Sequence, residues 1–305
     1  MNDIDKKLLS EINALEYEVA DAYNIRKNGS GIERKVNEYI NILSKEDNSG
    51  IDIYVKEDTL SGVIDIPVII TESGIKDIVY NDFHIGKNSN VTIIAGCGIH
   101  NMMHENSEHD GIHRFFLGKN SKVKYLENHY ASGDGTGKKI LNPTTEITME
   151  DGSYMMMKTT QIKGVDSTIR KTQAVLKENT TLVINEKILT SGIETATTEF
   201  LVELNGKNSS THVVSRSVAT EKSYQEFISN VVGNTECYGR IECDAILKDN
   251  GRVKSTPEIF AKSLDASLTH EATIGKIAGA ELTKLMSLGL NEKEAEEAII
   301  NGFLK

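Results

Sequence analysis

The sequence has no tryptophan, only three prolines and only three cysteines among its 305 residues. Three cysteines, an odd number, cannot form a complete disulfide framework, so we expect free thiols and a reducing, cytoplasmic location. Aromatic residues make up only 6% of the chain, so its core must be built mainly from Ile, Val, Leu and Met. With so few prolines, long stretches of backbone can pair in sheets without interruption.

The sequence also lacks long apolar runs and long basic runs. No apolar stretch approaches the ~20 residues that a membrane-spanning helix needs. The acidic first residues lack the apolar core of a secretion signal. Lys and Arg number 34 against 45 Asp and Glu, which gives 34 − 45 = −11, and no basic run exceeds two residues. A chain this acidic repels phosphate backbones, so neither nucleic acid nor a membrane is expected as a partner.

A polar turn followed by a strand-like segment recurs along the middle of the chain. Its copies are residues 86–91, 118–123, 150–155, 177–182 and 206–211. Their Ser or Thr positions, 89, 121, 153, 180 and 209, are separated by 32, 32, 27 and 29 residues. Gly and Asn accept the positive φ of a tight turn, and stacking the strands that follow would build parallel sheets. This predicts a right-handed parallel β-helix. A β-sandwich is the alternative, although sandwiches rarely repeat one turn five times.

Helices are predicted at both ends of the chain. Apolar residues at three- and four-residue steps predict a helix over 4–23 and a shorter one over 33–43. Near the C-terminus the pattern predicts a helix over 275–288, then a second one that Asn291 caps with Glu294 as the capping-box partner. We therefore predict a helical segment 1–48, a β-helix 49–265 and a helical, partner-docking segment 266–305.

The densest set of chemically reactive side chains follows the first cysteine. Five metal-ligating residues fall within seventeen positions: Cys97, His100, His104, His109 and His113. Thiolate and imidazole suit zinc, iron and copper, so a metal-storage or metal-sensing protein is one hypothesis. The spacing matches no standard zinc pattern, and the acidic residues between these positions favour a solvated surface loop.

Two other motifs carry less chemistry by themselves. Cys237 and Cys243 are too far apart for a zinc knuckle, and a cysteine in a strand is most often a small buried apolar residue. The glycine-rich run 132–139 lacks the first Gly and the final Ser or Thr of a phosphate loop. No Gly-x-Ser-x-Gly nucleophile motif occurs either. We therefore expect neither an ATPase nor a serine hydrolase in this chain.

The C-terminal third resembles the SufB/SufD family of iron–sulfur cluster assembly proteins. The resemblance is carried by residues 242–247 around Cys243, by residues 268–277 with His270 and Glu271, and by residues 289–303. Gly96-Cys97 also looks like the start of a family element, although a histidine-rich stretch follows where the family has Thr-Ala-Pro. The resemblance implies a β-helix that serves as an assembly scaffold and is not itself an enzyme.

The resemblance also implies roles for individual residues. The Glu at position 271 makes the chain SufB-like, with Cys243 as sulfur acceptor and cluster ligand, Glu271 as a second ligand and His270 close by. Cys97 would receive or relay sulfur. The implied cargo is a transient iron–sulfur cluster. The implied partners are a SufC-type ABC ATPase on the C-terminal helices and a second subunit, in a homodimer or a SufB/SufD-type heterodimer. The chain departs from bacterial SufB in lacking its long N-terminal region and the cysteine cluster there.

A third class of protein is compatible with the predicted fold, a β-helix carbohydrate-active enzyme. The scarcity of aromatic sugar platforms and the lack of a secretion signal speak against it.

Overall fold

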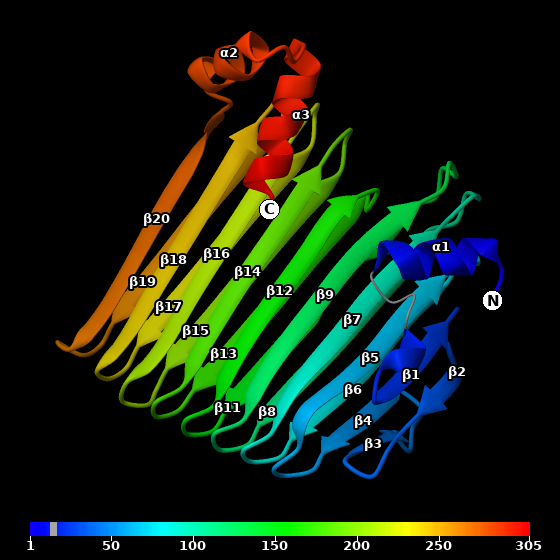
Figure 1. Cartoon of the computed structure of the whole chain (residues 1–305), viewed down its shortest axis with the longest axis vertical. Coiled ribbons are helices and arrows are strands. Elements are labelled where there is room, and N and C mark those ends of the chain that lie inside the picture. Colours follow the sequence, from blue (N-terminus) through cyan, green and yellow to red (C-terminus); the bar gives the residue numbers. More distant parts are fainter. Residues whose placement is uncertain (13–16) are drawn as a thin grey trace.

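The chain folds into a parallel β-solenoid of about eight turns, with 60% of its residues in strands and a few helices at each end. The structure is a computed structural model that describes residues 1–12 and 17–305. Two ten-stranded sheets face one another along the solenoid (Figure 1). The predicted parallel β-helix is therefore confirmed.

The chain alternates between the two sheets, so each coil contributes one strand to each. Sheet A runs in the order β2 (Ser30–Lys35), β1 (Ala22–Lys27), β5 (Leu60–Ile70), β7 (Asn90–His100), β9 (Lys122–Ser132), β12 (Tyr154–Lys163), β14 (Thr181–Thr190), β16 (Ser209–Ala219), β18 (Cys237–Leu247) and β20 (Ala266–Lys276). Sheet B runs in the order β19 (Arg252–Ala261), β17 (Tyr224–Gly233), β15 (Thr195–Leu204), β13 (Ser167–Leu176), β10 (Lys139–Leu141), β8 (Ser107–Leu117), β6 (Lys76–Ile85), β4 (Gly50–Val55) and β3 (Ile40–Ser44), with β11 (Thr144–Met149) between β13 and β8.

The repeat read from the sequence is the repeat of the solenoid. Successive coils of sheet A pair Asn90 with Lys122, Lys122 with Tyr154, Tyr154 with Thr181 and Thr181 with Ser210, offsets of 32, 32, 27 and 29 residues. The five Ser or Thr residues of the turns are all buried. The residue before each takes the left-handed conformation: Asn88, Asn120, Gly152, Asn179 and Asn208. Polar turns with Asn or Gly at one fixed position therefore set the coil length.

The core lies between the two sheets and runs the length of the solenoid as one cluster of Ile, Val, Leu, Phe and Met side chains. Burial alternates residue by residue along the strands, as in β13, β14 and β17. Because neighbouring residues of a strand point to opposite faces, each strand places one set of side chains inside and the other outside. Whether a residue occupies an inward or an outward position of its strand therefore decides which candidate residues can meet.

The N-terminal segment departs from the prediction. The first helix, α1 (Asp3–Glu11), ends well before residue 23, and a short 3₁₀ turn, η1 (Tyr17–Val19), follows it; residues 13–16 of the predicted helix lie outside the described residues. The helix predicted over 33–43 is wrong, because these residues contribute to β2 and β3. Ile40 and Ile42 are buried whereas Leu43 is exposed, a period of two that suits a strand pairing with β4. Strand pairing thus begins at Ala22, ahead of the predicted boundary at 49.

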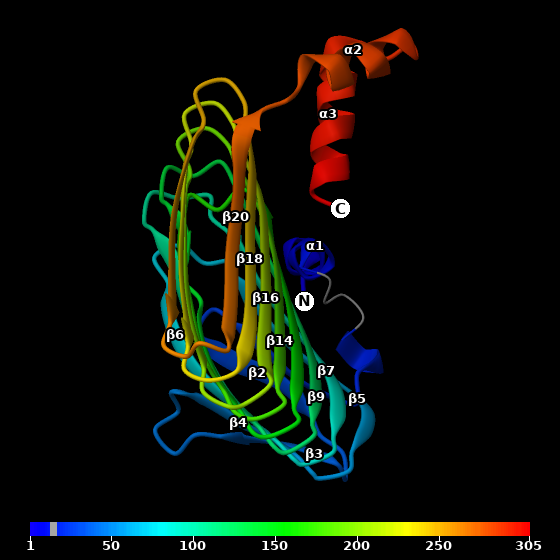
Figure 2. The same ribbon diagram turned by 90° about the vertical axis from the view of Figure 1, so that its left-hand side faces the viewer.

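At the N-terminal end of the solenoid, this segment forms two antiparallel hairpins and a helix. Strand β2 folds back antiparallel on β1, and β3 folds back antiparallel on β4. Helix α1 covers the outer face of sheet A (Figure 2), where Gly96 and Gly98 leave it room. A Cβ on Gly96 would lie 2.8 Å from the Cβ of Ile12, and one on Gly98 would lie 3.2 Å from the Cβ of Leu8. Two glycines on β7 therefore permit the close approach of the helix.

The C-terminal helices are α2 (Gly279–Ser287) and α3 (Glu292–Phe303). The predicted capping box at Asn291 is confirmed, with the Glu294 amide donating to Asn291 Oδ1 at 3.0 Å. The helix predicted from 275 begins only at Gly279, because residues 266–276 form β20. Helix α3 folds back beside the outer face of sheet A (Figure 2), where Lys248 Nζ lies 2.6 Å from Glu296 Oε2. Within the described parts of the chain, no helix has the length and apolar character needed to cross a membrane.

Candidate functional site

Cys243 lies on the inner face of sheet A, in the last-but-one strand, β18. It is 1% exposed and belongs to the main core cluster. Its neighbours in register are Ser215 on β16 and Ala272 on β20. Burial raises the pKa of the Cys243 thiol to about 11, with the nearby Ser255 hydroxyl opposing that rise. The sulfur is therefore a protonated thiol at neutral pH, screened from solvent by a single further coil.

His270 reaches the same interior from the last strand. It shares its face of β20 with Leu268, which packs on the core cluster, and it pairs in register with Ile241, two residues before Cys243. Burial lowers the pKa of His270, so its imidazole is neutral. His270 Nε2 is buried and has no hydrogen-bond partner among the described residues, and the buried Ser255 Oγ has none apart from the Cys243 thiol. The end of the solenoid thus places a thiol, an imidazole and a hydroxyl near one another with polar capacity unused.

Glu271 points the other way. It pairs in register with Glu242 on the outer face of sheet A, and Arg240 Nη2 lies 3.4 Å from its Oε2. Glu242 in turn accepts from His212 Nε2 at 3.1 Å and lies 2.6 Å from Arg240 Nε. Within one chain the structure therefore brings Cys243 and His270 to the interior and leaves Glu271 in an exposed ion-pair cluster. The role of Glu271 as a cluster ligand stays a prediction.

Cys237 belongs to a different place on the same strand. It faces the interior, as Cys243 does, but six residues away, which is about 20 Å along an extended strand. A glycine lies directly against it, since a Cβ on Gly233 would come within 2.9 Å of the Cys237 sulfur. Cys237 and Cys243 of one chain therefore cannot bind one cluster together.

Cys97 lies in the interior of an early coil. It is 3% exposed, and burial, together with the negative charges of Asp77 and Glu127, raises the pKa of its thiol well above the usual value. A small internal cavity of about 20 Å³ contacts Cys97, His109 and His113 among others. The structure thus places these three candidates around one cavity inside the solenoid and not on the expected surface loop.

The other two histidines of the predicted metal set lie elsewhere. His100 Nδ1 is 2.9 Å from Ser132 Oγ, and His104 Nδ1 is 2.7 Å from Thr136 Oγ1, both at the loops that leave β7 and β9. The structure therefore divides the five residues between the interior and a loop. Across residues 1–12 and 17–305, the one group whose ligand atoms all lie within 4.8 Å of one another is Asp52, Asp82 and His84.

That acidic group is already neutralised. Lys45 Nζ pairs with both Asp52 and Asp82, and Arg114 Nε lies 2.7 Å from Asp82 Oδ1. His84 stacks between the rings of Tyr54 and Phe116, with centroids 4.7 and 5.1 Å away. Both carboxylates already pair with Lys or Arg side chains, so these residues form a surface ion-pair cluster.

Two rows of inward-facing side chains link the coil of Cys97 to the coil of Cys243. One row on sheet A runs Ala95, Glu127, Thr159, Glu186, Ser215 and Cys243, each paired in register with the next. The neighbouring row runs Cys97, His129, Gln161, Ile188, Ser217 and Ala245. Every member of both rows is buried. The two thiols are five strands apart, about 24 Å, and most side chains between them are polar.

An ion network holds the middle of these rows, and the sequence analysis missed it. Arg170 on sheet B pairs with Glu127 and lies 3.7 Å from Glu186 Oε1. Burial alone would raise the pKa of Glu127, but Arg170 and His129 hold it well below its usual range. Glu186 accepts from Ser215 Oγ at 2.8 Å, and its pKa is raised because it is buried. The sequence does hold a signal for this network. Both glutamates fall at positions of their strands that face the interior, where apolar residues are expected.

The fold and these interior groups define a class: a parallel β-solenoid whose buried thiols are linked by a polar interior. Comparison with known proteins narrows it. The family model for the SUF system FeS cluster assembly SufBD core domain matches residues 72–303, more than half of the chain. The chain therefore belongs to the SufBD family, as its motifs predicted, and this membership indicates a role in iron–sulfur cluster assembly.

Several archaeal relatives are similar to this chain over most of its length. An iron-sulfur cluster assembly SufBD family protein of Methanocaldococcus jannaschii is 29% identical over 82% of this chain and 74% of its own. A SufBD family protein of Archaeoglobus fulgidus is 27% identical over 90% of this chain and 73% of its own. One from Pyrococcus horikoshii is 27% identical over 77% of this chain and 71% of its own.

Proposed function

We propose that this chain is a scaffold on which an iron–sulfur cluster is assembled at the C-terminal end of the solenoid, with Cys243 as the sulfur acceptor. The observation that carries the proposal is a buried thiol beside an unpartnered imidazole at the end of a polar interior, in a chain of the SufBD family. Metal storage has no comparable support, because the five predicted metal ligands do not lie together. Carbohydrate hydrolysis has none either, because the chain belongs to the SufBD family.

The chemistry of the acceptor step follows from these groups. The Cys243 thiolate would attack the outer sulfur of a donor persulfide, so that a new S–S bond forms on Cys243 as the donor's S–S bond breaks and the donor leaves as a thiolate. A thiol whose pKa is about 11 needs a base for this step. The neutral imidazole of His270 is the available base on the same face of sheet A.

The donor set of one chain is incomplete for a cluster. Cys243 supplies one sulfur ligand and His270 one nitrogen ligand, whereas iron–sulfur clusters are held by about four protein ligands. Cys237 is too far along β18 to contribute. We therefore infer that a second subunit, another copy or a SufB/SufD-type relative, completes the site at this end.

The end of the solenoid is suited to that contact. β19 and β20 are the last strands of the two sheets, so each presents an unpaired backbone edge. Ile259, Phe260 and Leu264 are 44%, 55% and 104% exposed there. An open edge with exposed apolar side chains is a template for pairing with another chain, and pairing would bring two Cys243 interiors together.

We propose that Cys97 is the thiol that first receives sulfur. Its separation of about 24 Å from Cys243 excludes direct thiol–persulfide exchange between them within one solenoid, because exchange needs the two sulfurs in contact. We propose that sulfur crosses the buried polar rows between the two thiols as a small persulfide or polysulfide that keeps its S–S bond, so that Cys243 can attack its outer sulfur while the remaining sulfur leaves as a thiolate or hydrosulfide.

The C-terminal helices are the proposed docking site for a SufC-type ABC ATPase. None of the residues of α2 is buried, and Met286 and Leu288 on this hairpin are 42% and 75% exposed. Replacing Met286 by Asp should abolish co-purification with that ATPase, whereas Ile193→Asp, on the turn between β14 and β15, should leave it unchanged. Equal binding by both variants would place the ATPase elsewhere.

The scaffold proposal is tested by anaerobic reconstitution with iron and sulfide, followed by visible absorption. The wild type should develop sulfur-to-iron charge-transfer bands that Cys243→Ala loses completely. Cys237→Ala is the matched control, because it removes an inward-facing thiol from the same strand, and it should keep the bands. Bands that survive in Cys243→Ala and vanish in Cys97→Ala would move the site to the cavity around His109 and His113.

A further inference from the structure

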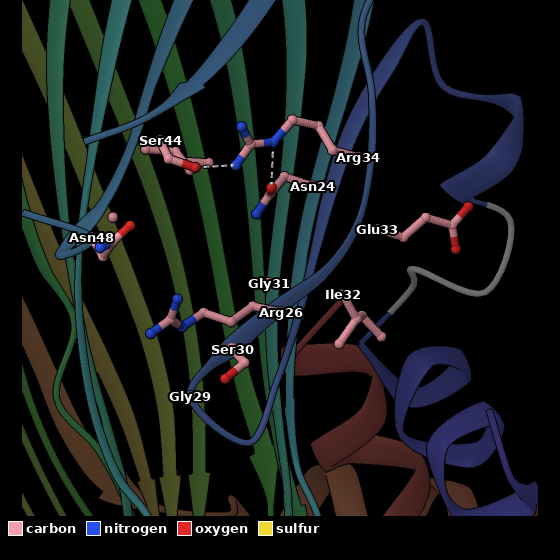
Figure 3. Close-up of a pocket in the computed structure, with 12 residues that line it drawn as sticks. Asn24, Arg26, Gly29, Ser30, Gly31, Ile32, Glu33, Arg34, Ser44 and Asn48 are labelled. Carbon is pink, nitrogen blue, oxygen red and sulfur yellow. Dashed lines mark hydrogen bonds between the residues drawn. The ribbon is translucent and has the colours of Figure 1, made fainter. Parts of the chain in front are cut away.

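A large cavity lies at the other end of the solenoid, far from Cys243. It has a volume of about 540 Å³ and is formed by β1, β2 and the β3–β4 hairpin (Figure 3). We call it the N-terminal pocket. All twelve of its lining residues lie between Asn24 and Ile51. They therefore precede residue 72, where the family match begins, so the family gives this pocket no role.

Two arginines line the N-terminal pocket, and they differ in how their charge is compensated. Arg26 is neutralised by Asp77, with Nε 2.8 Å from Oδ2 and Nη2 2.6 Å from Oδ1. Arg34 donates only to neutral acceptors: Asn24 Oδ1 at 2.9 Å, the Ile42 carbonyl at 3.2 Å and Ser44 Oγ at 3.0 Å. Among the described residues Arg34 forms no ion pair, so no carboxylate compensates its charge.

The residues around Arg34 hold its guanidinium in place but leave some of its N–H donors without a hydrogen bond. A guanidinium has five N–H donors and three are used, so 5 − 3 = 2 remain. Partial burial lowers the pKa of Arg34, because no carboxylate offsets the lost hydration. Ser44 Oγ accepts from Arg34, so its own O–H is free to donate to a ligand. A planar fork held in place by three hydrogen bonds, with two donors left over, is a geometry that can bind an oxyanion.

The acidic residue nearest to Arg34 in the chain does not compete for it. Glu33 lines the same cavity, but Figure 3 shows its carboxylate turned away from both arginines. It accepts instead from the Tyr23 hydroxyl at 2.6 Å. Adjacent residues of a strand point to opposite faces, so Glu33 and Arg34 cannot meet across β2. The positive charge of Arg34 is left facing a cavity far larger than a water molecule.

We propose that the N-terminal pocket binds an oxyanion, the phosphate or carboxylate group of a small polar molecule, with Arg34 as the charged ligand. Asn24 and Ser44 orient the guanidinium, and the volume leaves room for the rest of such a molecule. The lining carries few apolar side chains, chiefly Ile32 and Ile51, so the ligand is polar throughout. This site is independent of cluster assembly at Cys243.

The test is isothermal titration of the full chain with inorganic phosphate and with citrate, at constant ionic strength. The wild type should bind at least one of them, and Arg34→Gln should weaken that binding ~10-fold or more, as expected for the loss of a charge-assisted hydrogen bond. Binding of phosphate alone identifies a phosphorylated ligand, and binding of citrate alone a carboxylated one. Ser44→Ala keeps the charge and should weaken binding by only a few-fold.

The matched control is Arg252→Gln. Arg252 also lacks an ion pair among the described residues, but it stacks over the Tyr224 ring at the far end of the solenoid. Its replacement should leave the affinity within about twofold of the wild type, because no bound oxyanion loses a ligand. The proposal is overturned if the wild type binds neither anion at tens of millimolar, if Arg34→Gln binds as well as the wild type, or if Arg252→Gln loses as much. Equal unfolding midpoints of the variants exclude misfolding as the cause.

Discussion

The two ends of the solenoid are finished in different ways, although the same repeat leads to both. At the N-terminal end, the short antiparallel strands β2 and β3 form the edges of the sheets, and α1 packs on the outer face of sheet A over a buried cluster of its own. At the C-terminal end, β19 and β20 stop as open edges, and the helices that follow leave the interior side uncovered. Short antiparallel edge strands discourage pairing with another chain, whereas long parallel edge strands are templates for it, and the candidate thiol lies beside the long edges.

The largest expected difference between the two ends is in how a substitution at each affects the oligomeric state. Ile259 lies on the inward-facing side of β19 and is 44% exposed because nothing follows that strand. If the chain forms the homodimer that we propose, Ile259→Asp should convert it into a monomer of 33.6 kDa, measured by light scattering after size-exclusion chromatography. Ile193→Asp, at a side turn where the side chain is 83% exposed, should leave the dimer intact. A wild type that is monomeric at tens of micromolar would contradict a homodimer.

The next effect concerns the helices at the two ends. Leu8 on α1 is 1% exposed, so Leu8→Ala should lower the free energy of unfolding by about 3 kcal/mol through the cavity it leaves. Leu288, between the C-terminal helices, is 75% exposed, and Leu288→Ala should change it by less than about 0.5 kcal/mol. Urea unfolding of both variants measures the difference. Similar losses would mean that the C-terminal helices cover a core as α1 does.

A third difference is the pH dependence of stability, which should come from the half of the interior near Cys97. Burial lowers the pKa of His113 to about 4, although the Glu127 charge opposes this. Because the unfolded histidine, with a pKa near 6.5, binds a proton before the folded one does, stability is complete above about pH 7 and falls as the pH drops towards 4. Between pH 7.5 and 5 the loss from this residue should be about 2 kcal/mol.

His113→Gln should remove that part of the pH dependence, measured as urea unfolding at several pH values. His104→Gln is the control, because His104 lies in an exposed loop and its replacement should keep the wild-type slope. An unchanged slope in His113→Gln would show that the buried histidine does not control acid unfolding.

The smallest effect concerns the turns, which are alike from one end to the other. Asn120 has a φ of 56°, a conformation that disfavours residues with an ordinary side chain. Asn120→Ala should therefore cost about 1 kcal/mol of unfolding free energy, and Asn120→Gly much less. Gly152 occupies the equivalent position of the next coil, so Gly is already accepted there. Equal losses from both replacements would assign the cost to the lost hydrogen bond between Asn120 and Asn88.

The sequence by itself determined the solenoid and its repeat. Coil lengths of 32, 32, 27 and 29 could be predicted because each turn needs a residue that tolerates positive φ, and that requirement is local. The same holds for the capping box at Asn291, which depends on two residues three positions apart. Family membership was equally readable, since the motifs around Cys243 and His270 are contiguous.

Only the tertiary structure decided which side chains meet. Strand parity places Cys243 and His270 inside and Glu271 outside, and stacking over several coils brings Arg170 between Glu127 and Glu186. Residues 40–43 became part of a strand because pairing with β4 buries Ile40 and Ile42, a tertiary gain that outweighs local helix preference, and residues 33–35 extend antiparallel along β1. The conformation of a turn depends on neighbouring residues and can be predicted from them. Contacts across coils depend on the register of the strands, which exists only once the sheets have formed.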